Sequence, residues 1–185
     1  GNLQRKKTIT PSPSTILLDD EDMINDWFVS LVCQRMNFVG WTMKDQSRIG
    51  RSGTEKGVGE TDGWVKDGRG NQVFLFEAFR LGHHIDTTVI NKHLHKVSNY
   101  NSAGMSPIFI VVYAACNEFK SLCAAYKDHV EKLDYEGFEP GHNSGLRQRK
   151  PKMPSVNAEY FEETRQINGK EISIYHHLLH FKPPK

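Results

Sequence analysis

Two segments decide the fold: Gly59-Glu60-Thr61-Asp62-Gly63-Trp64-Val65 and, after a short turn, Phe74-Leu75-Phe76-Glu77-Ala78-Phe79-Arg80-Leu81. Both have the pattern of β-strands, and Asp67-Gly68-Arg69-Gly70 between them is typical of a turn, so we expect a hairpin. Glu77 lies within an otherwise apolar strand, where a lone carboxylate is costly unless it is paired or metal-bound. Asp62 lies on the preceding strand, and adjacent antiparallel strands can bring two carboxylates together. Such a pair predicts a site for Mg²⁺ or Mn²⁺, which prefer oxygen ligands.

The rest of the chain predicts one α/β domain, residues 16–185, with a mixed central sheet flanked by helices and a C-terminal β-hairpin. Residues 1–15 have the composition of a linker, which suggests that the domain belongs to a larger protein. Helical spacing predicts helices over 19–37, 86–99 and 117–133, and a glycine-rich, proline-containing and basic loop covers 136–155. The predicted strands are 41–46, 60–66, 73–81, a buried 107–114, and a final hairpin that turns at Asn168-Gly169 and ends with 172–181.

The composition sets limits on function. The 185 residues carry a net charge of +2, so nucleic-acid binding would depend on local basic patches, namely Arg48 with Arg51 and the run from Arg147 to Lys152. Three cysteines without a CxxC pair argue against a disulfide framework and favour the cytoplasm. No apolar run approaches the ~20 residues needed to cross a membrane. The sequence contains no phosphate-binding P-loop, no nucleophile elbow and no histidine spacing that is typical of zinc sites.

The run Gly59-Glu60-x-Asp62, a turn, and an apolar strand carrying Glu77 resembles the PD-(D/E)xK nucleases, most closely their resolvase-like and Mrr-like branches. The resemblance covers about residues 19–115 and implies a restriction-endonuclease-like core. It also implies metal-dependent hydrolysis of phosphodiester bonds, with DNA favoured over RNA as the substrate. By this resemblance Asp62 and Glu77 are the catalytic metal ligands, and Glu60 and Glu21 are further candidate ligands.

One residue departs from the family pattern. The family lysine stands two residues after the glutamate, where this chain has Phe79, and Arg80 should point to the opposite face of the strand. That lysine is expected to orient water and to offset charge in the transition state. A lysine on the next helix, Lys92 or Lys96, could replace it, or Arg80 could turn inward at a β-bulge. We favour Lys96 as the catalytic cation, because the helix over 86–99 begins soon after the Glu77 strand and must pack back over the sheet, and Lys96 lies one helical turn from His93 on it.

The sequence leaves open whether the domain cuts nucleic acid or only binds a partner, and whether it forms a homo-oligomer. Candidate contacts to a nucleic-acid backbone are Arg48, Arg51, Arg80, Lys92 and His93, but the same fold without activity could bind nucleic acid or a protein partner instead. Further short motifs follow one another along the chain: Gly40-Trp41, Asp45-Gln46-Ser47, Glu77-Ala78-x-Arg80-Leu81, His93-x-x-Lys96, Tyr100-Asn101-x-x-Gly104 and Val112-Tyr113-Ala114. With these motifs the chain also resembles, over most of its length, a little-characterised bacterial domain that is attached to larger proteins, some of them in phage defence. Whether the chain forms a homo-oligomer is equally open.

Overall fold

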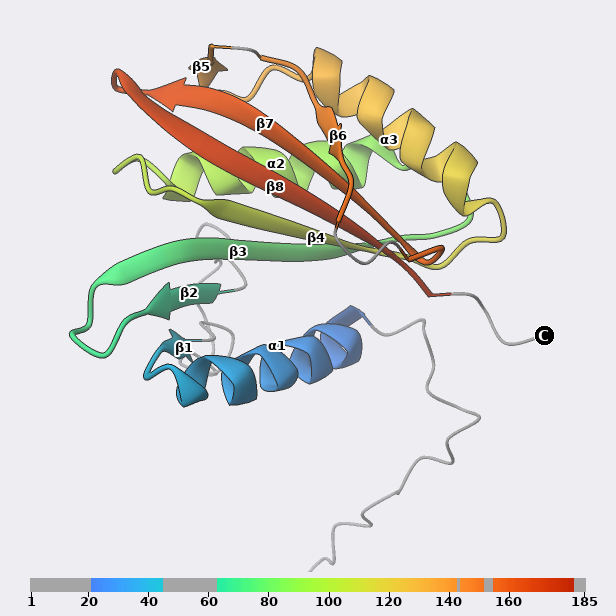
Figure 1. The fold of residues 1–185 in the computed structure, drawn as a ribbon. Helices are drawn as coiled ribbons and strands as arrows, with labels where there is room; N and C mark the ends of the chain where they lie inside the picture. Colours follow the sequence, from blue (N-terminus) through green and yellow to red (C-terminus); the bar gives the residue numbers. More distant parts are fainter. Residues whose placement is uncertain (1–20, 45–62, 143, 152–154, 182–185) are drawn as a thin grey trace, which may run out of the picture.

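The computed structural model describes residues 21–44, 63–142, 144–151 and 155–181, and Figure 1 shows how their helices and strands are arranged. The helices are α1 Glu21–Phe38, α2 Thr87–Tyr100 and α3 Phe119–Lys132. The strands are β1 Thr42–Lys44, β2 Gly63–Lys66, β3 Gln72–Leu81, β4 Ile108–Ala114, β5 Glu139–Pro140, β6 Arg147–Arg149, β7 Ala158–Ile167 and β8 Lys170–His180. Within this part of the chain, no helix is both long and apolar enough to cross a membrane.

The strands form one mixed sheet in the order β1-β2-β3-β4-β8-β7-β5, and β6 also pairs with β7. The pairs β1–β2, β2–β3 and β7–β8 are antiparallel, whereas β3, β4 and β8 run parallel to one another. The apolar run of β4 therefore lies at the centre of the sheet, as expected of a strand that is buried on both faces. This arrangement confirms the predicted fold class, a mixed α/β sheet flanked by helices with a C-terminal hairpin.

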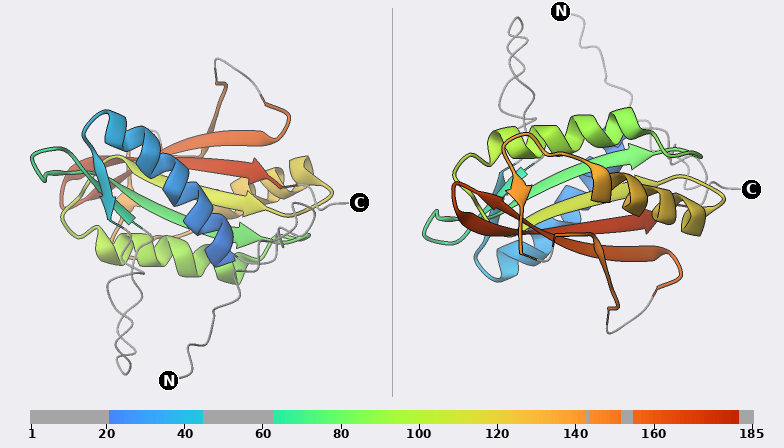
Figure 2. Two further views of the ribbon diagram at one scale, coloured as in Figure 1. Left: turned by 90° about the horizontal axis from the view of Figure 1, so that it is seen from below. Right: turned by 90° about the horizontal axis from the view of Figure 1, so that it is seen from above.

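Helices cover the two faces of the sheet unequally. The helix α1 packs on one face, and α2 and α3 pack on the other (Figures 1 and 2). Side chains of β3 alternate between the faces, as a strand requires: Phe74, Phe76 and Ala78 join the core beneath α1, whereas Leu75, Phe79 and Leu81 join the core beneath α2 and α3. Glu77 belongs to the second set by its position in the strand, so it faces α2.

The position of α2 follows from its start. Asp86 is its N-cap, and the carboxylate accepts hydrogen bonds from the backbone N–H groups of Thr88 and Val89. The helix therefore begins just after β3 ends and runs back over that strand. Buried residues at helical spacing hold it there: Ile90, Leu94 and Val97. The same geometry places the residues between them close to the middle of β3.

The final third of the chain contains one hairpin that was predicted and two strands that were not. Strands β7 and β8 pair along their whole length, and Asn168 (φ 51°) and Gly169 (φ 73°) supply the left-handed backbone of a tight turn. The loop expected over 136–155 is not wholly irregular, because it contains β5 and β6. Both strands are two or three residues long, exposed and polar, so they have no alternation of apolar residues that could reveal them.

Candidate functional site

Glu77 forms a cluster with two basic residues of α2. Its side chain is fully buried, yet its Oε1 atom lies 2.7 Å from Nδ1 of His93 and accepts a hydrogen bond from Nζ of Lys96 at 2.9 Å. The two basic residues are three positions apart on α2, so both reach the same carboxylate oxygen. We call Glu77, His93 and Lys96 the Glu77 cluster. A buried carboxylate in an apolar strand is thus stabilised by partners from a neighbouring helix.

Phe79 lies two residues after Glu77 on β3 and packs against the cluster. Its ring stacks on the ring of His93, with centroids 4.7 Å apart and planes inclined by 22°. Phe79 itself is fully buried, so the imidazole lies against a fixed apolar surface on one side and Glu77 on its Nδ1 edge. The aromatic residue therefore restricts the orientation of the histidine that binds Glu77.

The basic members of the cluster reach solvent although the carboxylate does not. The side chains of His93 and Lys96 are 12% and 18% exposed, compared with 0% for Glu77. A ligand approaching from the solvent side would meet a cation and an imidazole first. The cluster therefore combines a buried carboxylate, which favours a cation, with basic groups that favour an anion such as a phosphate.

Five other predicted site residues are not described in full. Asp62, Glu60, Arg48 and Arg51 lie outside the described residues. Glu21 is the first residue of α1, which packs on the face of the sheet opposite to that of Glu77; its side chain lies outside the description.

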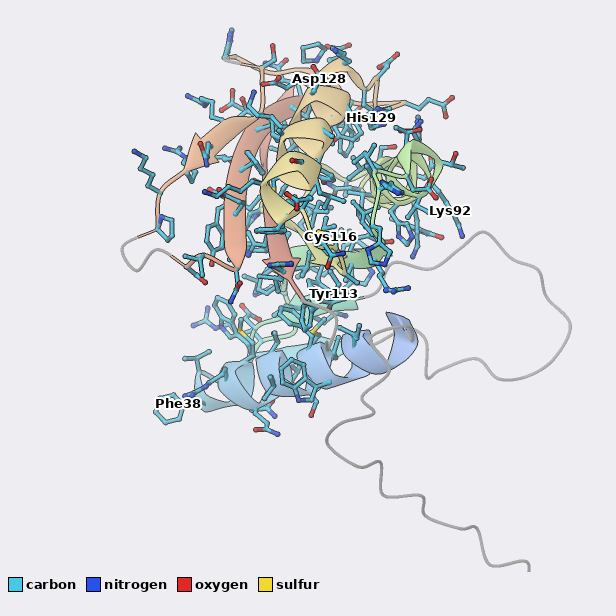
Figure 3. All side chains as sticks on the ribbon, turned by 90° about the vertical axis from the view of Figure 1, so that its right-hand side faces the viewer. Phe38, Lys92, Tyr113, Cys116, Asp128 and His129 are labelled. Carbon is cyan, nitrogen blue, oxygen red and sulfur yellow. The ribbon has the colours of Figure 1, made fainter. Side chains whose placement is uncertain are left out.

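The structure separates Arg80 and Lys92 from the Glu77 cluster. Arg80 follows the regular alternation of β3, because the pairing of β3 with β4 is continuous from Leu75 to Leu81, and a bulge that would turn Arg80 inward is not found there. Lys92 is exposed and points away from the body of the protein on α2 (Figure 3). Lys96, one of the cations proposed in place of a lysine at position 79, donates a hydrogen bond to Glu77 at 2.9 Å.

A second polar cluster was missed by the sequence analysis. Glu163 of β7 accepts hydrogen bonds from the Tyr135 hydroxyl at 2.7 Å and from Nε of Arg165 at 2.9 Å, and it forms an ion pair with Nη2 of Arg165 at 2.8 Å. Its Oε1 also lies 3.1 Å from Nε2 of His176, whose Nδ1 is 2.8 Å from the Tyr126 hydroxyl. When Nε2 of His176 donates to Glu163, Nδ1 accepts from the tyrosine if the ring is neutral and donates to it if the ring is charged. We call these five residues the Glu163 network.

Burial and charge act against each other in the Glu163 network. Burial raises the pKa of Glu163, but the hydrogen bond and charge of His176, the charge of Arg165 and the hydroxyl of Tyr135 together hold that pKa below its ordinary value. Burial, followed by the charge of Glu163, raises the pKa values of Tyr126 and Tyr135 well above their ordinary range. Glu163 is therefore ionised at neutral pH inside the core, and its partners carry the donors that this requires.

One cavity lies at the carboxyl ends of β3 and β4. Its volume is about 590 Å³, and it is lined by residues that follow these strands or begin α3: His83, His84, Ile85, Asn117, Glu118, Ser121, Leu122 and Ala125. Crevices at this end of parallel strands are common ligand sites in α/β proteins. The described part of the chain contains no group of three histidine, cysteine or acidic residues placed to hold a metal ion.

Comparisons with protein-family models, with curated proteins and with solved structures find no match to this chain. The geometry of the Glu77 cluster is therefore the main evidence about its function.

Proposed function

We propose that this chain is a metal-dependent nuclease, or a domain derived from one, that hydrolyses phosphodiester bonds of DNA at the Glu77 cluster. The single observation that carries the proposal is the hydrogen bond of 2.9 Å from Nζ of Lys96 to Glu77. It supplies a cation beside the strand carboxylate, although the strand position where the family has lysine holds Phe79. Lys96 also keeps 18% of its side chain exposed, so the charge can face a phosphate as well as Glu77.

Asp62 is the proposed second carboxylate. Strand β2 begins at Gly63, which pairs with Phe76, and Trp64 pairs with Leu75. Asp62 directly precedes Gly63 in the sequence, and we propose that it acts together with Glu77. Asp62 itself is outside the described residues, so its role stays a prediction.

The donor set fits Mg²⁺ or Mn²⁺, because one or two carboxylates together with water and substrate oxygens are sufficient for such ions. Glu77 and Asp62 would hold the ion, which when bound would polarise a phosphate and lower the pKa of a bound water. Lys96 would offset negative charge on the phosphate, and His93 would fix the orientation of Glu77 through its Nδ1 atom. Hydrolysis would join a water oxygen to phosphorus and break one bond to an ester oxygen, which would leave with a proton.

One observation favours a different function. His93 and Lys96 both contact the same oxygen of Glu77, and Phe79 packs on His93, so the cluster resembles a structural ion-pair network. A catalytically inactive module with this fold could use its surface to bind nucleic acid or a protein. The two functions differ in whether the purified chain cuts a phosphodiester bond.

A cleavage assay separates the two functions. The chain is incubated with single-stranded and duplex DNA and with RNA, in Mg²⁺, in Mn²⁺ and in a chelator. We expect metal-dependent cleavage that falls about 10²- to 10³-fold in Lys96→Met, because removal of one contact that stabilises transition-state charge has this effect. Lys120→Met, which removes an exposed lysine of α3, serves as the matched control and should keep full activity. Absence of cleavage with either metal would contradict the proposal and favour the inactive module.

A further inference from the structure

Aromatic side chains form a row on the other face of the sheet, the face on which α1 packs. Phe109 of β4 stacks on Tyr175 of β8, with ring centroids 5.4 Å apart and planes inclined by 23°. The ring of His177 meets Phe109 edge-on at 5.8 Å and Tyr160 of β7 edge-on at 5.1 Å. We call Phe109, Tyr160, Tyr175 and His177 the aromatic row. Tyr175 and His177 alternate along β8 with residues that face α2 and α3, which places the row on the opposite surface from Glu77.

The helix α1 does not extend over the β7 end of this row. It contacts β1 and β3 and crosses the sheet diagonally, leaving β7 outside its path (Figure 2, left). A cavity of about 400 Å³ lies there, lined by Arg149, Lys150, Pro151, Tyr160, Phe161, Glu162, Tyr175 and His177. Tyr160, Tyr175 and His177 are only partly buried, so aromatic surface reaches this cavity.

The rim of the cavity is basic. Arg147 and Arg149 of β6 pair with Glu162 and Tyr160 of β7, which places both arginines on the same face as the aromatic row. Arg149 forms an ion pair with Glu162, and Lys150 follows directly and lines the cavity. Three cations therefore stand beside one carboxylate, and Arg147, Arg149 and Lys150 are all exposed.

His177 contributes a flat ring rather than a charge. Burial lowers its pKa, and the neighbouring His176 lowers it further. The imidazole is therefore uncharged at neutral pH, so the positive charge of the cavity lies at its rim and its floor is aromatic. This separation of aromatic and cationic groups matches a ligand with flat rings on one side and anionic groups on the other.

We propose that the aromatic row and the basic rim bind single-stranded nucleic acid. Bases would stack on Tyr160 and Tyr175, and phosphates would contact Arg147, Arg149 and Lys150, as in proteins that bind single strands through aromatic platforms in a basic groove. A duplex offers the phosphates but keeps its bases stacked on one another. An acidic peptide offers the negative charge without the rings. A single strand offers both unstacked bases for the aromatic row and phosphates for the basic rim.

This surface is independent of the proposed chemistry at Glu77. The two sites lie on opposite faces of the sheet, and binding at the aromatic row requires neither a metal ion nor cleavage. The inference would hold for an active nuclease, where the surface would retain a strand, and for an inactive module, where it would be a principal binding site. Binding in the absence of metal therefore tests it separately from the proposed function.

Fluorescence anisotropy with labelled DNA, in the presence of a chelator that prevents cleavage, is the test. We expect a single strand of thymidines to bind more tightly than a duplex of the same length. Each of Tyr160→Leu and Tyr175→Leu should weaken binding by about 5- to 100-fold, because stacking of one base on an aromatic residue contributes that much. Tyr175→Phe keeps the ring and should bind like the unmodified chain, because the ring rather than the hydroxyl makes the contact, and circular dichroism checks that both leucine variants are folded.

The cationic rim has its own readout. The double variant Arg147→Gln, Lys150→Gln should reduce the slope of log K against log salt by about 1.4, because each cation that contacts a single strand contributes about 0.7. Lys120→Gln, on α3 of the opposite face, should leave the slope unchanged. Equal binding of duplex and single strand, unchanged affinity in both leucine variants, or displacement by polyglutamate as readily as by an oligonucleotide would each overturn the proposal.

Discussion

The Glu77 cluster and the Glu163 network contain the same kinds of group and differ in their access to water. Each has a buried glutamate, a histidine, a basic residue and an aromatic ring that packs on one of them: Phe79 stacks on His93, and Arg165 lies over the ring of Tyr135 at 4.1 Å. In the Glu163 network every member is at most 8% exposed. In the Glu77 cluster the two basic residues keep 12% and 18% of their side chains exposed.

Access of the side chains to water, rather than the kinds of residue present, distinguishes a candidate site from a structural element. A charge network that is closed to solvent on all sides has no place for a ligand. Removing one of its charges therefore lowers mainly the free energy of unfolding. In a cluster whose basic residues reach water, these residues can contact a substrate. Removing one of the charges should therefore reduce mainly binding or catalysis. The same substitution in both places therefore gives a direct test.

The largest effect on stability is expected for Glu163→Gln. The substitution preserves the size of the side chain but leaves Arg165 without its buried counter-charge, and breaking such a buried pair costs about 3–5 kcal/mol. Denaturation by urea, followed by circular dichroism, measures the free energy of unfolding.

Glu77→Gln is the matched control, and we expect it to lower that free energy by less than Glu163→Gln does, because Lys96 and His93 keep contact with water whereas Arg165 is almost fully buried. If the free energy of unfolding falls equally in the two variants, the Glu77 cluster has a structural role like that of the Glu163 network.

A smaller effect is expected from acidification. The pKa of Glu163 lies below its ordinary 4.5 in the folded protein, so the unfolded chain binds the proton more readily than the folded one. The stability that this carboxylate contributes is fully present at neutral pH and is lost as the pH falls below about 5 and through the folded pKa.

Urea denaturation of the unmodified chain and of Glu163→Gln over this pH range checks the prediction. The difference in unfolding free energy between the two proteins should shrink as the pH falls. A difference that stays constant from neutral to acidic pH would show that the ionisation of Glu163 is not what stabilises the network.

Much of the fold and part of the site follow from local patterns. The apolar run of β4 predicts a central strand, and a single carboxylate in β3 draws attention to Glu77. The spacing of Ile90, Leu94 and Val97 predicts which side of α2 packs down, and with it that His93 and Lys96 lie near β3. These inferences need only the period of a strand or a helix and a short connection between them.

The Glu163 network could not be predicted in the same way. Tyr135, Glu163 and His176 come from three separate segments, and each is unremarkable in its own surroundings. The pairing of Glu163 with Arg165 depends on β7 being buried, which its mostly charged and polar sequence does not indicate. The helix α3 and the strand β8 cover this part of β7, and that cover is a property of the tertiary fold.

Binding of Mn²⁺ to the unmodified chain and to Glu77→Gln, Asp62→Asn and Glu163→Gln tests the central claim most directly. The free ion is measured by electron paramagnetic resonance at neutral pH, on proteins shown by circular dichroism to be folded. We predict one bound ion in the unmodified chain, weaker binding by at least about tenfold in Glu77→Gln and in Asp62→Asn, and unchanged binding in Glu163→Gln. Binding that is absent from the unmodified chain, or that survives both Glu77→Gln and Asp62→Asn, would contradict the account.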